Sequence, residues 1–287
     1  MVSGARELQD DTLTPAQVTD IDAMVSTLRG RTVAILTGAG VSTDSGIPDY
    51  RGAGALPRNP MTFQQFISSP DYRKRYWAGS HLGWRRFDAA RPNGGHDAIA
   101  ALEASGIVNG TITQNVDGLH QRAGSMRVID LHGTLDRVFC LNCSQGFARA
   151  DIAARLAVQN PWLEALDHGD LGPDGDVMVE HLDAFVTPEC SVCGGILKPD
   201  IVFFGEFVPV EKFAEARALV QSADALLIAG SSLVVNSGIR LLGLATKRRV
   251  PVVIINRGAT RGDQRATVKV DGGASELLTI LAARLSR

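Results

Sequence analysis

The chain has 287 residues, of which 45% are hydrophobic and 21% are charged. This composition allows a packed core and excludes a largely disordered or fibrous protein. The 29 basic and 31 acidic side chains give a formal net charge of -2, so we expect no nucleic-acid partner and no anionic membrane partner. The first twenty residues are acidic and lack an apolar run, and no apolar run in the sequence is long enough to span a bilayer. These features predict a cytoplasmic protein.

The first half of the chain predicts a helix, a β-branched strand, an aromatic-rich lobe of short helices, a second helix and two further strands. Their expected ranges are 15–29, 31–36, 47–92, 98–103, 107–113 and 128–131. Thr14 is the expected N-cap of the first helix, and Pro15 occupies its first position. The first strand ends at a glycine-bearing turn, as strands do where an α/β sheet meets a ligand.

The second half predicts an extended segment, a helix, a buried strand, a helix, a second buried strand and a closing helix. Their expected ranges are 201–204, 210–222, 225–229, 238–246, 250–255 and 274–285. Strands that alternate with helices, two of them continuous apolar runs, predict a doubly wound parallel sheet of the α/β class.

The four cysteines form two pairs, Cys140 with Cys143 and Cys190 with Cys193, separated by 46 residues. Two such CxxC pairs can place four thiolates around one tetrahedral Zn²⁺. The alternatives are a redox pair or two disulfides, and an intracellular location disfavours disulfides. His168 and His181 lie between the pairs as rival ligands, but four thiolates already complete the site, so we expect a structural zinc and exposed histidines.

Three glycine-bearing turns follow three of the expected strands, at 38–40, 230–232 and 256–258. The first resembles the start of a dinucleotide-binding fingerprint, but Thr43 stands where the third glycine belongs, so the motif alone is weak. The carboxyl ends of parallel strands meet at one edge of a sheet, so these turns should converge on one crevice. Their amides and hydroxyls could bind a pyrophosphate and two riboses.

Polar side chains also follow the strands expected over 107–113 and 128–131. Gln114, Asn115 and Asp117 suit hydrogen bonding to a ribose or a carboxamide, although such residues often only cap turns. His132 lies at a strand end beside a glycine, where an imidazole can act as a general base. A lone histidine is more often structural, and the pattern alone barely separates His132 from His96 and His120.

Together these segments resemble the sirtuin family over roughly residues 20–287. The matching strings are GAGVSTDSGIPDYRG at 38–52, TQNVDGLH at 113–120, LHG at 131–133, both CxxC pairs, LKPDIVFFGE at 197–206, GSSL at 230–233 and NRG at 256–258. The long stretch between the cysteine pairs, RYWA at 75–78 and NSG at 236–238 resemble class II sirtuins more specifically. That branch includes the mitochondrial lipoamidase-type enzyme.

The resemblance implies an NAD-consuming protein-lysine deacylase whose partners are acylated-lysine proteins. His132, Asn115 and Asp117 are the implied catalytic residues. The residues implied to bind NAD are Gly38, Ala39, Gly40, Ser42, Asp44, Ile47, Asp49, Tyr50, Arg51, Gln114, Asn115, Val116, Asp117, Gly230, Ser231, Ser232, Asn256, Arg257, Gly258 and Ala274. The acyl-lysine peptide is implied to add as a strand, contacting Val202, Phe203, Phe204, Gly205, Glu206, Leu233 and Val234.

The resemblance also implies a mechanism and a division of the chain. The acyl oxygen attacks the ribose as nicotinamide leaves, His132 deprotonates a ribose hydroxyl, and the products are O-acyl-ADP-ribose and free lysine. A Rossmann-like NAD-binding domain is implied for 1–48, 94–136 and 197–287, a cofactor loop and helical module for 49–93, and a zinc module for 137–196. The rival functions are a protein ADP-ribosyltransferase and a non-catalytic NAD sensor, although intact His132, Asn115 and Asp117 argue against the sensor.

The sequence leaves the preferred acyl group open. Tyr50, Phe63, Phe66, Tyr72, Tyr76 and Trp77 lie in or after the cofactor loop, which covers the acyl channel in the family. If these aromatic side chains line a channel, groups longer than acetyl should fit; if they fill a core, the enzyme is a plain deacetylase. Tyr50 replaces the phenylalanine usual in the family. Tyr72 and Arg75 have the spacing of a pair that marks acidic-acyl selectivity in some relatives, but we expect them on an exposed helix.

Overall fold

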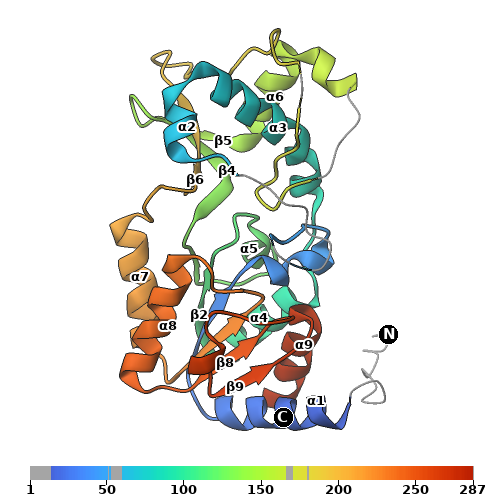
Figure 1. The fold of residues 1–287 in the computed structure, drawn as a ribbon, viewed down its shortest axis with the longest axis vertical. Helices are drawn as coiled ribbons and strands as arrows, with labels where there is room; N and C mark the ends of the chain where they lie inside the picture. Colours follow the sequence, from blue (N-terminus) through green and yellow to red (C-terminus); the bar gives the residue numbers. More distant parts are fainter. Residues whose placement is uncertain (1–13, 51, 53–59, 166–170, 180, 287) are drawn as a thin grey trace.

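The computed structural model describes residues 14–50, 52, 60–165, 171–179 and 181–286, which form two lobes (Figure 1). The larger lobe contains a six-stranded parallel sheet with the strand order β3-β2-β1-β7-β8-β9. Its strands are β1 (Val33–Thr37), β2 (Val108–Thr113), β3 (Val128–Asp130), β7 (Ala225–Ala229), β8 (Val252–Ile255) and β9 (Val268–Val270). Helices cover both faces of this sheet, which confirms the predicted doubly wound α/β fold.

The two faces of the sheet bury separate hydrophobic clusters. One face packs against α1 (Pro15–Leu28), α4 (Gly94–Ala104) and α9 (Ala274–Leu285), and the other against α7 (Val210–Gln221) and α8 (Asn236–Arg248). Successive side chains of a strand point to opposite faces, so Leu227 belongs to the first cluster and its neighbours Leu226 and Ile228 to the second. Because both faces are covered, a continuous apolar run is the sequence that such a strand requires.

The smaller lobe is built on a three-stranded antiparallel sheet with the order β5-β4-β6. Its elements are α2 (Phe63–Ser68), α3 (Pro70–Ala89), β4 (Gly133–Cys140), β5 (Gly146–Ala148), α6 (Arg149–Gln159) and β6 (Leu197–Ile201). One hydrophobic cluster joins residues from the helical segment, such as Trp77, with residues from the cysteine-bearing segment, such as Leu156. The helical and zinc modules expected as separate units therefore share one core.

The aromatic-rich segment differs from the prediction, since α3 is a single helix of 20 residues where short helices were expected. Gly79 and Gly83 inside it would ordinarily weaken a helix. Here they are needed for packing: a Cβ on Gly79 would lie 2.2 Å from the carbonyl oxygen of Val177, and one on Gly83 would lie 2.1 Å from that of Gly175. The loop 171–178 thus packs directly on the backbone of α3.

Other boundaries also differ from the prediction. The segment 197–201, expected in the NAD-binding domain, is strand β6 of the small lobe and pairs with β4. The extended segment was expected over 201–204, but the observed strand lies earlier in the chain and ends at Ile201. Strand β9 and the short helix α5 (Leu119–Arg122) were not predicted, since three or four residues are too few to show a periodic pattern. Among the described residues, no helix is long and apolar enough to cross a membrane.

The N-cap predicted at Thr14 is confirmed, and its geometry recurs elsewhere. The Thr14 hydroxyl accepts from the Gln17 amide, and the Gln17 side chain accepts from the Thr14 amide. Asn93 caps α4 in the same way, but there Nδ1 of His96 is the acceptor, at 3.3 Å from the Asn93 amide nitrogen. An accepting Nδ1 has no proton, so the His96 ring is neutral. Burial lowers the pKa of His96 to about 4.

This neutral, fully buried histidine makes stability depend on pH. Between the unfolded pKa of about 6.5 and the folded pKa of about 4, the unfolded chain binds a proton that the folded chain does not. The stability contribution of His96 is therefore present above pH 6.5 and is lost as the pH falls, by about 2 kcal/mol at pH 5. The Gln side chain in His96→Gln can still accept from the Asn93 amide. Between pH 7 and pH 5, we expect the free energy of unfolding of this variant to fall by about 2 kcal/mol less than that of the wild type.

Denaturant unfolding at both pH values measures this difference. The matched control is His181→Gln, since His181 lies in an exposed loop and should keep the wild-type pH dependence. Equal pH dependence in the His96→Gln variant and the wild type would contradict the assignment of a neutral imidazole.

Candidate functional site

A cavity of about 1720 Å³ lies between the two lobes, at the carboxyl ends of the parallel strands. Every residue that the sequence implied for NAD, peptide or catalysis lines this cavity, except Arg51, which lies outside the described residues. Two of the lining turns follow β1 and β7, the neighbouring strands at which the order of the sheet reverses. A doubly wound sheet binds its ligand at this switch point.

The glycines of these two turns allow the backbones to touch. The Gly40 amide donates to the Gly230 carbonyl oxygen at 2.9 Å. A Cβ on Gly40 would lie 2.9 Å from the Gly230 Cα, and one on Gly230, whose φ is +63°, would lie 2.4 Å from the Val41 nitrogen. Any larger residue at either position would separate the turns and distort the floor of the cavity.

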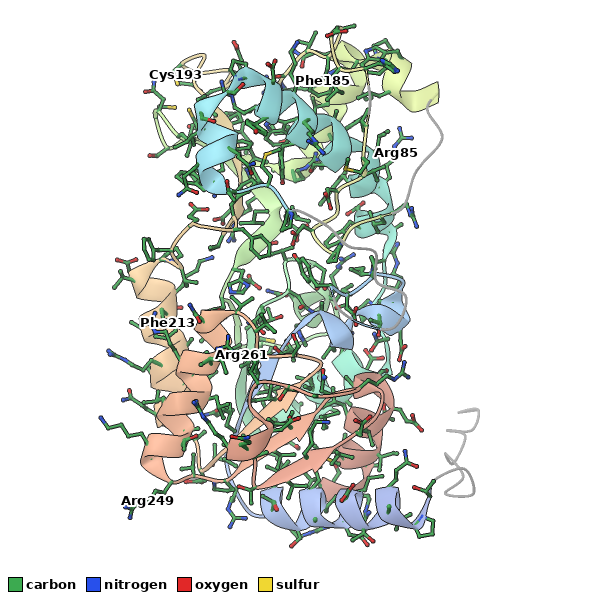
Figure 2. The ribbon with its side chains drawn as sticks, in the orientation of Figure 1. Arg85, Phe185, Cys193, Phe213, Arg249 and Arg261 are labelled. Atoms are coloured by element: carbon green, nitrogen blue, oxygen red, sulfur yellow. The ribbon has the colours of Figure 1, made fainter. Side chains whose placement is uncertain are left out.

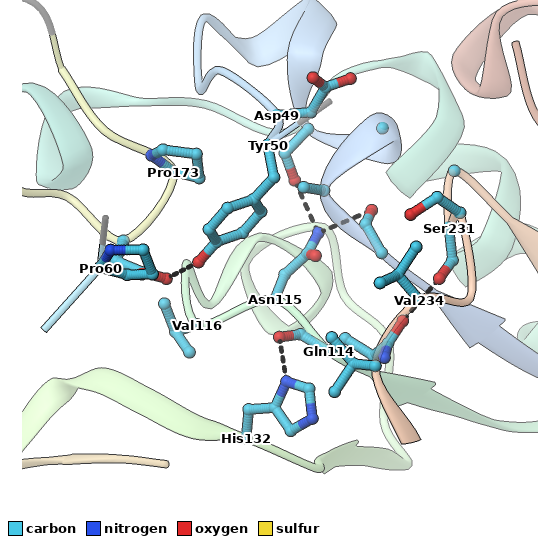
Figure 3. A pocket seen from close by; sticks show the side chains of 18 of the residues that line it. Asp49, Tyr50, Pro60, Gln114, Asn115, Val116, His132, Pro173, Ser231 and Val234 are labelled. Atoms are coloured by element: carbon cyan, nitrogen blue, oxygen red, sulfur yellow. Dashed lines mark hydrogen bonds between the residues drawn. The ribbon is translucent and has the colours of Figure 1, made fainter. Parts of the chain in front are cut away.

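Asn115 and Asp117 form one hydrogen-bonded group with Ser42 beneath the cavity. Ser42 donates to the Asp117 carboxylate at 2.7 Å. The Asn115 amide group donates to the Ser42 hydroxyl at 3.0 Å and to the Gly38 carbonyl at 3.2 Å (Figure 3). Burial raises the pKa of the Asp117 carboxyl, although hydrogen bonds from Leu119 and Ser42 oppose this shift. The carbonyl oxygen of the Asn115 side chain has no partner among the described residues, so it is available to a ligand.

His132 is held at both ring nitrogens. Nδ1 lies 3.1 Å from the Gln114 carbonyl oxygen, and Nε2 lies 2.9 Å from the Ser237 hydroxyl. A carbonyl oxygen can only accept, so Nδ1 bears the proton and Nε2 presents a lone pair. Burial lowers the pKa of His132, which keeps the ring neutral at pH 7 and able to accept a proton.

The other histidines that resembled His132 in sequence do not line the cavity. His96 and His120 are fully buried, with ring centroids 4.8 Å apart. His120 contacts the Thr37 hydroxyl at 2.9 Å beneath the end of β1, and burial lowers its pKa to about 3. Geometry therefore separates the three histidines where the sequence could not, and His132 is the candidate base.

The segment 202–206, implied to contact the peptide, is fixed from the small lobe. The Val202 amide donates to the His132 carbonyl oxygen at 2.8 Å, which joins this segment directly to the base. Lys198 is 2% exposed, contacts the Glu206 carboxylate at 3.1 Å and lies against the rings of Phe63, Phe139 and Phe203. Glu206 also accepts from the Phe203 amide at 2.9 Å. This ion pair, whose lysine is buried and whose glutamate is partly exposed, fixes the turn in which the peptide segment ends.

The cavity also has lining residues that the sequence analysis missed. Pro173, Asp174, Asp176, Val177 and Met178 come from the loop that packs on α3, and Ser237 and Arg240 come from α8. The signal for the loop was present in the two glycines of α3, whose missing side chains indicate a close neighbour. Tyr72 and Arg75 are exposed, as expected, but they also line the cavity.

The four cysteines form a single cluster at the end of the small lobe, where Figure 2 labels Cys193. The four sulfurs lie within 4.8 Å of one another, and the Cys140–Cys193 and Cys143–Cys190 pairs are 3.5 and 3.7 Å apart. Four sulfurs around one Zn²⁺ at about 2.3 Å are about 3.8 Å apart. A Cβ on Gly195 would lie 2.9 Å from the Cys140 sulfur, so this glycine allows the thiolates to close. The donor set fits a structural zinc and leaves no position for a substrate.

His181 is exposed and outside this cluster, as expected, and His168 lies outside the described residues.

The Sir2 family model matches residues 38–237 of the chain. "NAD-dependent protein deacetylase 1" of Mycobacterium avium is 53% identical over 267 residues, which cover 92% of this chain and 95% of that protein. "NAD-dependent protein lipoamidase sirtuin-4, mitochondrial" of Bos taurus is 42% identical, with 95% and 88% covered. A solved complex described as "Sir2-p53 peptide-NAD+" superimposes with a TM-score of 0.71 at 31% identity, with 92% of this chain and 97% of that chain covered.

Removal of one thiolate should release the metal and destabilise the small lobe. We expect Cys140→Ser and Cys193→Ser to lose zinc, because the binding energy of a closed zinc site is also folding energy. Atomic absorption should give close to one zinc per chain in the wild type and none in the variants, whose unfolding midpoints should fall. Ser144→Ala, a change beside the first pair, is the matched control that should keep the metal. A wild-type protein that contains no zinc, or that stays fully folded under chelation, would contradict the assignment.

Proposed function

The chain belongs to the Sir2 family, and from this premise we propose that it is an NAD-dependent protein-lysine deacylase that converts NAD and an acylated lysine into nicotinamide, O-acyl-ADP-ribose and free lysine. One observation supports this proposal above the others. The neutral His132 lines the same cavity as the glycine turns, Asn115 and the peptide segment, and its Nε2 is unprotonated and contacts the lining residue Ser237. A cofactor and a substrate strand can therefore meet at a base.

The chain supplies binding and proton transfer in this reaction. The glycine turns and Ser231 would hold the pyrophosphate and the adenosine half of NAD, whose glycosidic bond provides the leaving nicotinamide. Asn115 and Asp117 would position the nicotinamide end. Both line the cavity, and the Asn115 side-chain oxygen is available there as a hydrogen-bond acceptor. His132 Nε2 would accept the proton of a ribose hydroxyl, which then attacks the activated acyl carbon.

The peptide would lie between two exposed segments on either side of the cavity mouth. Phe204 pairs with Thr62 as an isolated bridge on one side. Val234 and Val235 follow the β7 turn on the other, and both are partly exposed. An extended peptide can add between such segments by main-chain hydrogen bonds, which places its lysine toward the neighbouring His132.

His132→Ala tests the central assignment. We expect deacylation to fall by about 10²–10⁴-fold, the contribution of a general base, while the Kd for NAD stays within a fewfold of the wild type, since the base acts after NAD is bound. Mass spectrometry of the products distinguishes the functions: O-acyl-ADP-ribose supports a deacylase, ADP-ribosylated protein indicates a transferase, and no product indicates a sensor. His181→Ala, outside the cavity, should behave as the wild type. Normal turnover by His132→Ala would refute the assignment.

We further propose that the channel admits acyl groups longer than acetyl, as in the class II branch that the sequence resembles. Of the six aromatic residues in question, Phe66 and Trp77 are fully buried in the core, whereas Tyr50, Tyr72 and Tyr76 line the cavity. Val177 and Met178 of the loop on α3 also line the cavity. The 42% identity to a sirtuin-4 lipoamidase supports the same proposal.

A comparison of acyl groups on one peptide backbone tests the channel. Each buried CH₂ contributes ~0.8 kcal/mol, and ordering the chain costs about 0.5–1.5 kcal/mol per flexible group. We expect kcat/KM for octanoyl- and lipoyl-lysine to equal or exceed that for acetyl-lysine. Met178→Trp, at an exposed position on the cavity wall, should reduce octanoyl turnover more than acetyl turnover.

A much lower kcat/KM for the long acyl groups would show a closed channel. Preference for succinyl-lysine, abolished by Arg75→Gln, would instead indicate that Arg75 selects acidic acyl groups.

A further inference from the structure

The hydroxyl group of Ser237 contacts the nitrogen that accepts the proton. Ser237 is the second residue of α8, is 6% exposed and lines the cavity. Its Oγ lies 2.9 Å from Nε2 of His132, and no other described group hydrogen-bonds to it. A buried hydroxyl in this position can orient the imidazole and hydrogen-bond to its basic nitrogen.

The direction of each hydrogen bond follows from the partners. Nδ1 of His132 must donate, because the Gln114 carbonyl can only accept. Nε2 is then the unprotonated nitrogen, so Ser237 donates its O–H to the Nε2 lone pair. The ring is consequently held at both ends, with its lone pair directed at the Ser237 hydroxyl, which lines the cavity.

The surrounding backbone places Ser237 at this distance. Gly238 follows it, and a Cβ at Gly238 would lie 3.2 Å from both the Gln114 side-chain nitrogen and a methyl group of Leu233. The start of α8 can therefore pack closely on Gln114, the residue whose carbonyl holds the other ring nitrogen. The Ser231 hydroxyl in turn donates to the Gln114 side chain at 2.7 Å. Three segments, the end of β2, the turn after β7 and the start of α8, thus fix one imidazole.

The position at a helix start adds an electrostatic effect. The first amides of the 13-residue helix α8 form the positive end of its dipole, which disfavours a cation nearby. An imidazole beside this end is more stable when neutral, which is the form that a general base needs before the reaction. Ser237 itself can donate a hydrogen bond but adds no charge.

We propose that Ser237 is the positioning residue of the general base. It occupies the Nε2 lone pair of His132 in the free enzyme and releases that nitrogen to the ribose hydroxyl when NAD binds. In the reaction the O–H bond of the ribose breaks and an N–H bond forms at Nε2. The Nδ1–H meanwhile keeps its hydrogen bond to the Gln114 carbonyl oxygen. The Ser237 hydroxyl then rotates about its Cβ–Oγ bond and can accept from the new N–H. The reaction part of this proposal rests on the proposed deacylase function.

Steady-state kinetics of Ser237→Ala and Ser237→Thr measure this role. We expect Ser237→Ala to lower kcat by about 10-fold, the lower end of what the hydrogen-bond partners of metal-ligating histidines contribute, with KM for NAD and for peptide within about twofold. Ser237→Thr keeps the hydroxyl and should recover most of kcat. Thr246→Val removes a hydroxyl from the same helix outside the cavity and should retain wild-type kcat.

Nitrogen NMR of the histidine side chains gives a readout that does not depend on activity. In the free enzyme the unprotonated Nε2 of His132, assigned by its loss in His132→Ala, should show a hydrogen-bonded shift. This resonance should move in Ser237→Ala and return in Ser237→Thr. The measurement remains valid if the chain has no deacylase activity, so failure of the proposed function and failure of the Ser237 assignment can be distinguished.

Three results would overturn the proposal. An unmoved Nε2 resonance in Ser237→Ala would show that the hydroxyl does not occupy the nitrogen. A raised KM for NAD at constant kcat would make Ser237 a cofactor contact. An equal loss of kcat in Thr246→Val would show that any weakening of α8 lowers activity, so the hydroxyl of Ser237 has no special role.

Discussion

The contact between the turns after β1 and β7 is the constraint on which the site depends. These are the central strands of the sheet, and their turns can approach so closely only because Gly40 and Gly230 have no side chains. The contact places the backbone amides of both turns on one floor and leaves the space above it open between the lobes. From this floor the end of β2 contributes Asn115 and Asp117, which are joined to it through Ser42 and the Gly38 carbonyl. The small lobe then provides the opposite wall of the cavity. The residues implied for the cofactor and those implied for the peptide therefore line one cavity.

The base and the peptide segment lie where the two lobes meet. His132 follows the last residues of β3 in the large sheet and directly precedes β4 in the small one. Its carbonyl accepts from Val202, just after β6, and its imidazole is held by Gln114 and Ser237 of the large lobe. One residue is therefore bonded to both lobes. The distance between the base and the peptide segment is therefore set by hydrogen bonds from both lobes.

The sequence predicted the parts of the fold that follow from local chemistry. The apolar runs of β7 and β8, the cap at Thr14 and the paired cysteines each have a local cause, and the structure agrees with the elements expected there. The turns and strand ends of the site were also visible, because glycines and polar residues follow buried strands. The wall of the channel could not be predicted. Gly79 and Gly83 are unfavourable inside a helix by local propensity, and their packing role is defined by Val177 and Gly175, more distant in the chain. Ser237 was visible only as part of the NSG string, and its place beside the base could not be predicted because its hydroxyl contacts His132, which is distant in the sequence.

The packing of the loop 171–178 on α3 has an evolutionary consequence. This loop belongs to the stretch between the two cysteine pairs, in which α6 also lies, and none of the described strands of the parallel sheet comes from that stretch. Insertions, deletions and substitutions there alter the wall next to Tyr76 while every strand of the large lobe keeps its register. Descendants of one ancestral gene can therefore diverge in the shape of the channel without re-evolving the nucleotide site, provided that the two glycines of α3 persist. The channel wall and the nucleotide site therefore lie in parts of the chain that can change independently.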